Sequence, residues 1–161
     1  MATYTDTHGF NRGSAAYPAK GGDRWSFYEV EIDLAAIATA RSAAGATALA
    51  ANDVLEVIPL PAGSWVQRVG VTVTTAEGEA GTLDIGDGSD VDGYIDGMDF
   101  NATGTSTNSL VLTEAAPNTV LGYSNGKHYT SADTIDVKFL TATPTAAVFR
   151  VWALVLDTNA S

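Results

Sequence analysis

Six aspartates lie between residues 81 and 100 and are the side chains of this sequence best suited to chemistry: Asp84, Asp87, Asp90, Asp92, Asp96 and Asp99. Carboxylate oxygens in a glycine-bent loop are the ligands that Ca²⁺ prefers. The central run GDGSDVDG would supply Asp87, Asp90 and Asp92, together with backbone carbonyls. The same residue types also make tight turns, because Asp hydrogen-bonds its own backbone and Gly accepts a positive φ. Two interpretations stay open, a calcium site on these three aspartates or an acidic turn between two strands.

Catalytic groups other than carboxylates are scarce. A nucleophilic enzyme needs a base that titrates near neutral pH, and the chain offers only His8 and His128, with no cysteine. No serine lies in a Gly-x-Ser-x-Gly motif. A carboxylate pair could hydrolyse a glycoside, but nothing in the sequence marks one aspartate as the protonated acid. We therefore expect no enzymatic activity, and we expect His128 to be a surface residue.

Charge is distributed unevenly along the 161 residues, whose formal net charge is −11. Residues 1–24 carry three basic and two acidic side chains, whereas residues 25–161 carry five basic and seventeen acidic ones. A body this acidic repels phosphate backbones, so we expect no nucleic-acid binding. No run approaches the ~20 apolar residues of a membrane span, and no signal peptide is visible. The composition predicts a soluble protein without a membrane partner.

Alternation of apolar and polar residues predicts a series of short strands. In residues 65–75 the alternation places Trp65 and Gln67 on the same face as Val69, Val71 and Val73. An Asn-Gly pair at 125–126 predicts a hairpin that joins residues 121–123 to 128–130. Residues 101–109 are small and polar, which predicts a loop. The predicted strands are residues 25–33, 53–60, 65–75, 110–113, 119–123, 128–130, 134–140 and 146–156.

One helix is predicted over residues 34–44. Asp33 can cap its first turn, Leu34 and Ile37 lie three residues apart, and Gly45 follows its end. A single short helix among many strands indicates an all-β fold. We predict an antiparallel, jelly-roll-like β-sandwich over residues 25–161, preceded by an extended N-terminal arm over residues 1–24.

The arm has glycines, spaced aromatic residues and no apolar periodicity. Such a segment is either a loose terminus or an arm that lies on a neighbouring subunit. For the second case, aromatic side chains would anchor the arm and basic side chains would pair with acidic groups. The contact residues predicted in this way are Tyr4, Phe10 and Tyr17 as anchors, and Arg12, Lys20 and Arg24 as ion-pair partners.

The last predicted strand, residues 146–156, is apolar on both faces apart from Arg150. One face of such a strand packs on the core of a sandwich. Its other face either belongs to the core as well or needs a loop, an arm or another subunit to cover it.

The order of these segments resembles small structural proteins of tailed bacteriophages. The resemblance extends over residues 25–157 and lies in the run from Asp53 to Phe100, the Lys-His-Tyr strand at 127–129, SADTIDVKFL and AAVFRVWALVLD. These are β-sandwich proteins of the virion, of the head-decoration or cement type. The motifs are patterns of turns and strands, and they include no catalytic motif.

The resemblance implies a protein made in the host cytoplasm and bound in many copies on the capsid surface. Its partners would be the major capsid protein and further copies of itself, with which it would commonly form a trimer. The bound protein would seal the joints between capsid subunits. Two other functions stay open. One is a fibre or tail component of the same virion. The other is a carbohydrate-binding sandwich that uses Ca²⁺ in the acidic loop and exposed aromatic residues such as Tyr94.

Overall fold

The computed structural model describes residues 3–4, 10–15, 24–107, 122–140 and 144–157, with the backbone alone for 3–4, 10–15, 24 and 105–107. Among these residues no helix is long and apolar enough to cross a membrane. The elements are β1 Thr3–Tyr4, β2 Phe10–Ala15, β3 Arg24–Asp33, α1 Leu34–Ala43, β4 Val54–Leu60, β5 Ser64–Thr75, β6 Thr82–Gly86, β7 Ile95–Asp99, β8 Gly104–Thr107, β9 Lys127–Tyr129, β10 Asp133–Phe139 and β11 Val148–Asp157.

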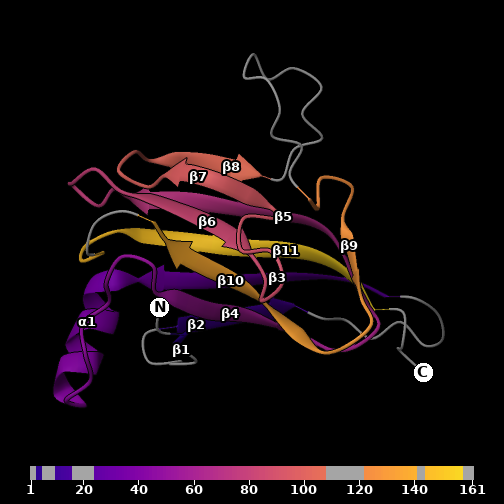
Figure 1. The fold of residues 1–161 in the computed structure, drawn as a ribbon, viewed down its shortest axis with the longest axis horizontal. Helices are drawn as coiled ribbons and strands as arrows, with labels where there is room; N and C mark the ends of the chain where they lie inside the picture. Colours follow the sequence, from indigo (N-terminus) through magenta and orange to yellow (C-terminus); the bar gives the residue numbers. More distant parts are fainter. Residues whose placement is uncertain (1–2, 5–9, 16–23, 108–121, 141–143, 158–161) are drawn as a thin grey trace.

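The strands form two sheets that face each other (Figure 1). Sheet A has the order β1-β4-β10-β6-β7, and sheet B has the order β2-β3-β11-β5-β8, with β9 added beside β5. Without β1, β2 and β9, eight strands remain, and apart from the β6–β7 pair in sheet A their chain order alternates between the sheets, as in a double Greek key. This is the arrangement of a jelly roll. The prediction of an all-β, jelly-roll-like sandwich is therefore confirmed.

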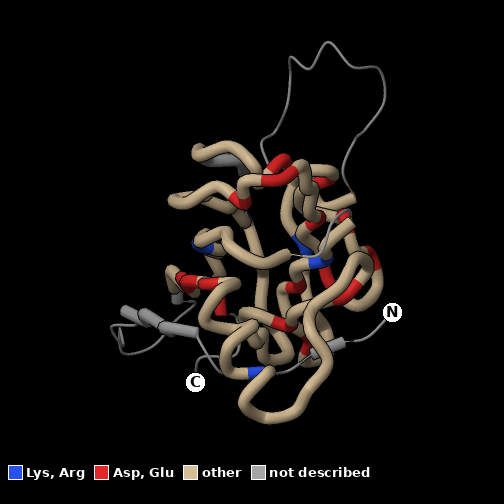
Figure 2. Tube along the Cα trace, turned by 90° about the vertical axis from the view of Figure 1, so that its left-hand side faces the viewer, with Lys and Arg blue, Asp and Glu red and all other residues tan. Residues whose placement is uncertain are grey.

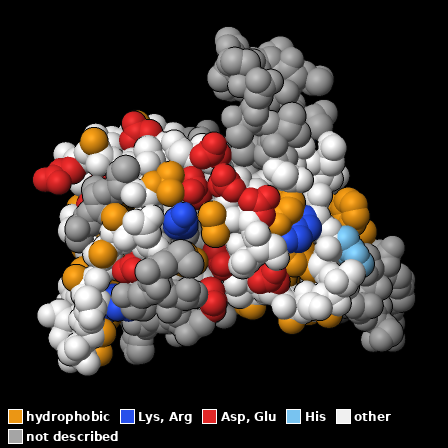
Figure 3. Space-filling model, in the orientation of Figure 1, with side chains coloured by type: hydrophobic (Ala, Val, Ile, Leu, Met, Phe, Trp, Pro, Cys, Tyr) orange, Lys and Arg blue, Asp and Glu red, His pale blue; other side chains and the backbone are white. Residues whose placement is uncertain are grey.

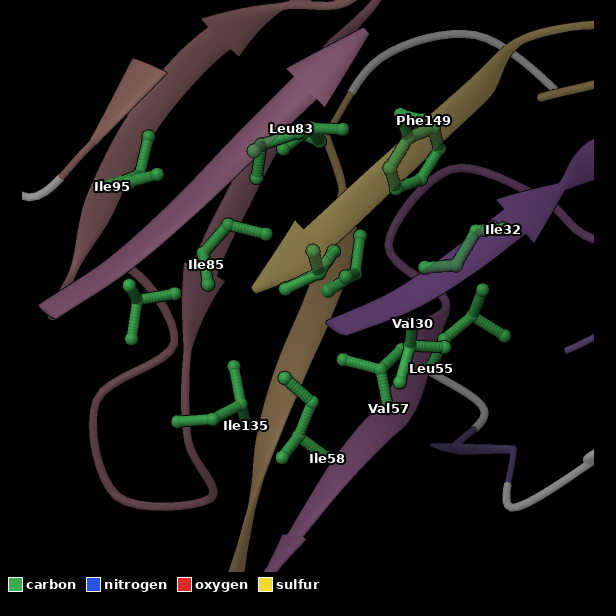
Figure 4. Close-up of a cluster of buried hydrophobic side chains, with 14 of the residues drawn as sticks. Val30, Ile32, Leu55, Val57, Ile58, Leu83, Ile85, Ile95, Ile135 and Phe149 are labelled. Atoms are coloured by element: carbon green, nitrogen blue, oxygen red, sulfur yellow. The ribbon is translucent and has the colours of Figure 1, made fainter. Parts of the chain in front are cut away.

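The core lies between the two sheets, where apolar side chains from both meet (Figure 4). Sheet A contributes Leu83, Ile85 and Ile135, and sheet B contributes Ile32 and Phe149, all without measurable exposure. Because side chains alternate along a strand, each of these residues has neighbours that point to the outer face of its sheet. Those outer faces are where the two sheets differ.

The predicted helix is confirmed as α1. Asp33 is its N-cap, and its Oδ1 accepts a hydrogen bond from the Ala36 amide at 3.0 Å. Leu34 and Ile37 are buried against the sandwich. Arg41 is buried in the last turn, where its Nε donates to the Thr47 carbonyl at 2.7 Å.

The predicted orientation of Trp65 and Gln67 is wrong, because β5 contains a β-bulge. Against β11, the register shifts so that Leu154 lies opposite Arg68 while Val155 lies opposite Val66. The extra residue moves the alternation by one place, which sends the side chains before it to the other face. Trp65 and Gln67 therefore point outward, while Val66 takes the inward position.

Two further predictions need correction. Residues 104–107, expected in a loop, form strand β8 beside β5. The segment at 127–129 is a strand, as predicted, but it pairs with β5 and not with residues 121–123. The turn before it places Gly126 fourth, with its amide bonded to the Tyr123 carbonyl, so the Asn-Gly pair does not occupy the two central positions of a type I′ turn. The strand predicted at 110–113 and most of that at 119–123 lie outside the described residues.

The N-terminal residues add one strand to each sheet. Strand β1 pairs with β4 in parallel, and β2 pairs with β3 antiparallel over Phe10–Ala15. In the sequence these residues were expected in an extended arm. In the structure they cover the β4 edge of sheet A and the β3 edge of sheet B within the same chain.

Candidate functional site

Asp87, a buried carboxylate of the acidic stretch, comes directly after β6. Its oxygens form an ion pair with the Lys127 ammonium and accept hydrogen bonds from the hydroxyls of Tyr129, at 2.7 Å, and Tyr123, at 3.2 Å. Lys127 and Tyr129 belong to β9, which is attached to sheet B, whereas Asp87 follows a strand of sheet A. Asp87 therefore connects the two sheets at one end of the sandwich.

The loop after Asp87 is shaped by the same carboxylate. Its Oδ1 also accepts from the amides of Ser89, at 2.8 Å, and Asp90, at 3.0 Å. Burial alone would raise the pKa of the Asp87 carboxyl, but the bonds from Lys127, Tyr129 and the two amides outweigh it and hold the pKa below its ordinary value. The pKa of Lys127 is raised, since its bonds to Asp87 and Tyr123 outweigh the effect of burial. The pair is therefore ionised at neutral pH.

Tyr94 lies beneath this cluster and extends it into the core. Its hydroxyl contacts the Tyr129 hydroxyl at 2.9 Å, and its ring packs edge-on against Tyr123 with centroids 4.9 Å apart. Burial raises the pKa of Tyr94 and of Tyr129 above the ordinary range. Tyr94 is completely buried, so it is not the exposed aromatic residue that the carbohydrate-binding interpretation required.

The three aspartates of the calcium interpretation do not share one environment. Asp87 is engaged by protein donors, whereas Asp90 and Asp92 are partly exposed. The pKa of the Asp90 carboxyl is raised, mainly by a hydrogen bond shared with Asp92 and secondly by burial. Within the described residues, no three Asp, Glu or His side chains are arranged to hold a metal ion. The calcium site stays a prediction, and the hydrogen bonds of Asp87 account for the shape of the loop.

Carboxylates also occupy the outer face of sheet A. Acidic positions greatly outnumber basic ones along the chain (Figure 2), and carboxylates gather around the few basic side chains on the face seen in Figure 3. Asp136 of β10 lies opposite Glu56 of β4 and accepts from the Thr134 hydroxyl at 2.6 Å. Burial, together with the charges of Glu56, Asp133 and Asp87, raises the pKa of Asp136 to about 7. Asp84 of β6 is buried beside the Gly97 amide, which donates to it at 2.8 Å.

The outer face of sheet B has a different character at the end where β3 and β5 begin and β11 ends. Three large aromatic side chains are exposed there: Trp25 at 50%, Phe27 at 47% and Trp65 at 38%. Leu154 and Leu156 of β11 lie between them in the register and are partly exposed. We call this surface the aromatic face, and its residues are Trp25, Phe27, Trp65, Trp152, Leu154 and Leu156.

Within the aromatic face, Trp152 lies across the neighbouring strand β5. A Cβ atom at Gly70 would be only 2.3 Å from the Trp152 ring, so the indole occupies the space that a side chain at position 70 would take. Phe27 is nearly parallel to Trp152, with an interplanar angle of 27° and centroids 5.8 Å apart. Trp65 stacks in the same way on His128, with an interplanar angle of 28° and centroids 6.2 Å apart. His128 is exposed, as predicted.

Basic residues lie within and beside the aromatic face. Arg68 is exposed and lies opposite Leu154 of β11, which in turn lies opposite Phe27 of β3, so the three residues form one row across the sheet. It makes no hydrogen bond or ion pair with any residue that the structure describes. Arg150, further along β11, is instead paired with Glu31 at 3.1 Å and Glu29 at 3.9 Å. Among the described side chains, Arg68 is thus a cation that lies within the aromatic face and has no partner.

The predicted contact residues of the arm are only partly described. The backbones of Tyr4, Phe10, Arg12 and Arg24 lie in strands β1, β2 and β3, and their side chains are outside the described set. Tyr17 and Lys20 lie outside the described residues altogether. The aromatic face was not predicted as a site. The available signals were the apolar outer positions of residues 146–156 and the three tryptophans, which the bulge in β5 brings to one face.

The fold is similar to that of chains in three phage capsid structures. For the capsid of Ralstonia phage GP4, the TM-score is 0.56 with 16% identity, over 91% of this chain and 92% of that one. For the cyanophage Pam1 capsid asymmetric unit, the values are 0.52 and 16%, over 91% and 93%. For the acidic stable capsid of Helicobacter pylori bacteriophage KHP30, they are 0.51 and 12%, over 91% and 92%. No protein-family model and no curated protein matches the sequence. The likeness is one of fold, over nearly the whole of each chain.

Proposed function

We propose that this chain is a structural protein of a phage virion, and specifically a capsid decoration protein that binds the major capsid shell. The observation that carries the proposal is the aromatic face. The core between the sheets is formed by other, buried side chains, and Trp25, Phe27 and Trp65 are not part of it. Large aromatic side chains left exposed side by side are typical of a surface that binds another macromolecule.

The similar structures support the same proposal from another direction. Each similarity covers more than nine-tenths of both chains, so the similar chains are about as long as this one. They belong to structures of phage capsids. A 161-residue jelly roll is thus a form in which proteins occur in such shells. The sequence resemblance to decoration proteins suggests the more specific role and a homotrimeric state.

A decoration protein stabilises a shell by mass action. A chain that binds only the assembled shell stabilises it by the free energy of that binding. If one copy contacts two shell subunits, their separation must also break these contacts. Net charge adds a second effect, because the acidic body disfavours contact with packaged nucleic acid and favours an outer position.

The proposal is tested with virions and shells of the phage that encodes this chain. Antibody labelling of virions in the electron microscope should place the protein on the head in many copies. Shells that lack the protein should bind purified chain and then resist heating to a higher temperature. Labelling of the tail would assign the protein to a fibre or tail component instead. Absence from the virion would overturn the proposal.

A further inference from the structure

We propose that the aromatic face is the docking surface for a different protein, and that this partner presents an apolar patch with a carboxylate at Arg68. The inference rests on the proposed function and names the surface and the partner chemistry. It begins from the contrast between the two outer faces. The outer face of sheet A is acidic and its buried carboxylates have donors within the chain, whereas the outer face of sheet B leaves aromatic rings exposed.

Residue types on the aromatic face are those that dominate binding energy in protein interfaces. Trp and Arg are enriched among such residues, and they act where they are surrounded by apolar contacts that exclude water. Here Phe27 and Leu154 lie in the same row as Arg68, while Trp25 and Trp65 lie in the row on one side and Trp152 lies in the row on the other side. The rings are also held in place before binding, because Trp152 lies against Gly70 and Phe27 lies beside Trp152. Preorganised rings lose little conformational freedom when a partner docks.

Arg68 specifies the charge of the partner. Its guanidinium has no acidic partner among the described residues, although the chain carries nineteen acidic side chains. A docked apolar surface would remove water from this cation, which is unfavourable unless the partner supplies a hydrogen-bonding anion. A carboxylate is the matching group, since the planar guanidinium can bind both of its oxygens.

The same residue argues against a second copy of this chain packed face to face. In a twofold interface the same patch meets itself. Two aromatic faces would then enclose two Arg68 side chains, and among the described residues Glu29 and Glu31 of the same outer face are already paired with Arg150. A different protein, such as a shell subunit, satisfies both the apolar and the charge requirement.

The test uses the full chain and shells of the major capsid protein from the phage that encodes it. Co-sedimentation gives the affinity of wild type, Phe27→Ser, Arg68→Glu and Arg68→Lys, with Asp96→Asn on sheet A as a matched control. We expect Phe27→Ser and Arg68→Glu to weaken binding by at least about tenfold. Arg68→Lys should retain more affinity than Arg68→Glu, because it keeps the charge. Asp96→Asn should bind like wild type. Thermal unfolding checks that each variant is folded.

The outcomes are distinguishable. If wild type and all variants bind equally, the proposed function stands and the aromatic face is not the docking surface. If wild type does not bind the shells, both proposals fail. Light scattering tests self-association. If wild type is an oligomer and Phe27→Ser is a monomer, the aromatic face binds a second copy of this chain. Quenching of tryptophan fluorescence by chitohexaose or cellohexaose, lost in Phe27→Ser, would assign it to a sugar. Either result overturns the inference.

Discussion

The two outer faces of the sandwich share the same strand geometry but carry different kinds of side chain. On sheet A, carboxylates are buried and bonded within the chain. Asp84 accepts from the Gly97 amide, and Asp136 accepts from the Thr134 hydroxyl. On sheet B, Trp25 and Phe27 are about half exposed. A buried polar group destabilises the folded chain unless it has a hydrogen-bonding partner. An exposed aromatic side chain contributes little to the free energy of folding, and its ring is removed from water only when a partner covers it. Sheet A should therefore govern stability and sheet B should govern binding.

The largest effect is expected at Asp87, which holds both sheets together at one end. Replacement by Ala would leave the Lys127 ammonium and the Tyr129 hydroxyl without their acceptor. Loss of one partner of a buried ion pair costs about 3–5 kcal/mol, and we expect about 3 because Lys127 retains 21% side-chain exposure. Urea unfolding of Asp87→Ala measures this change.

Asp96→Asn is the control for that experiment, because Asp96 is exposed on a neighbouring strand. Surface changes of this kind stay within about 0.5 kcal/mol. Equal stability of both variants would contradict the connecting role of Asp87.

The calcium interpretation makes a different prediction, a rise in the melting temperature of wild type with millimolar Ca²⁺ that Asp87→Ala abolishes.

The Asp87 cluster shows what could be predicted from the sequence and what could not. The acidic stretch was identified because Asp and Gly are close together in the chain. Its partners were missed because Lys127 and Tyr129 lie 40 and 42 residues away and β9 pairs with β5 instead of forming the expected hairpin. Glu77 is a similar case, since its carboxylate accepts from the amides of residues 145–147, about 70 residues later. Local patterns carry no information on such pairs.

The fold itself was largely accessible from the sequence. Clean alternation located the long strands, and a capping residue before an alanine-rich run located α1. The outward position of Trp65 was not accessible for one physical reason, the bulge in β5. A period-2 pattern predicts one face for Trp65 and Val69, but the extra residue between them places Trp65 outside. The place of Trp65 in the aromatic face thus depends on a single irregularity that alternation cannot reveal.

An intermediate effect is expected at Asp136, and it depends on pH. The pKa of Asp136 in the folded chain is raised to about 7 from an ordinary value of 3.8, so the folded state holds a proton that the unfolded state has lost. Stability should therefore fall as pH rises from about 4 to about 7 and then level off. For Asp136→Asn this fall should be absent, which leaves the variant more stable than wild type at about pH 8.

Urea unfolding at several pH values measures the Asp136 effect, with Glu79→Gln as an exposed control that should follow wild type. The Thr134 hydroxyl can donate to the Asn carbonyl as it does to Asp136 Oδ1, so the substitution keeps that hydrogen bond. A parallel pH profile for wild type and Asp136→Asn would contradict a protonated Asp136.

The smallest effect on stability is expected on the aromatic face. Trp25→Gln removes a ring that is 50% exposed and lies at the end of the register row with Leu156 and Trp65. The folded chain loses little buried apolar area, so the free energy of unfolding should change by less than about 1 kcal/mol. Binding to the shell should nevertheless weaken, because the lost ring belongs to the surface that the partner covers. Urea unfolding and co-sedimentation on the same preparation test both halves. A large loss of stability with unchanged binding would mean that the aromatic residues serve folding, and the contrast between the two faces would not hold.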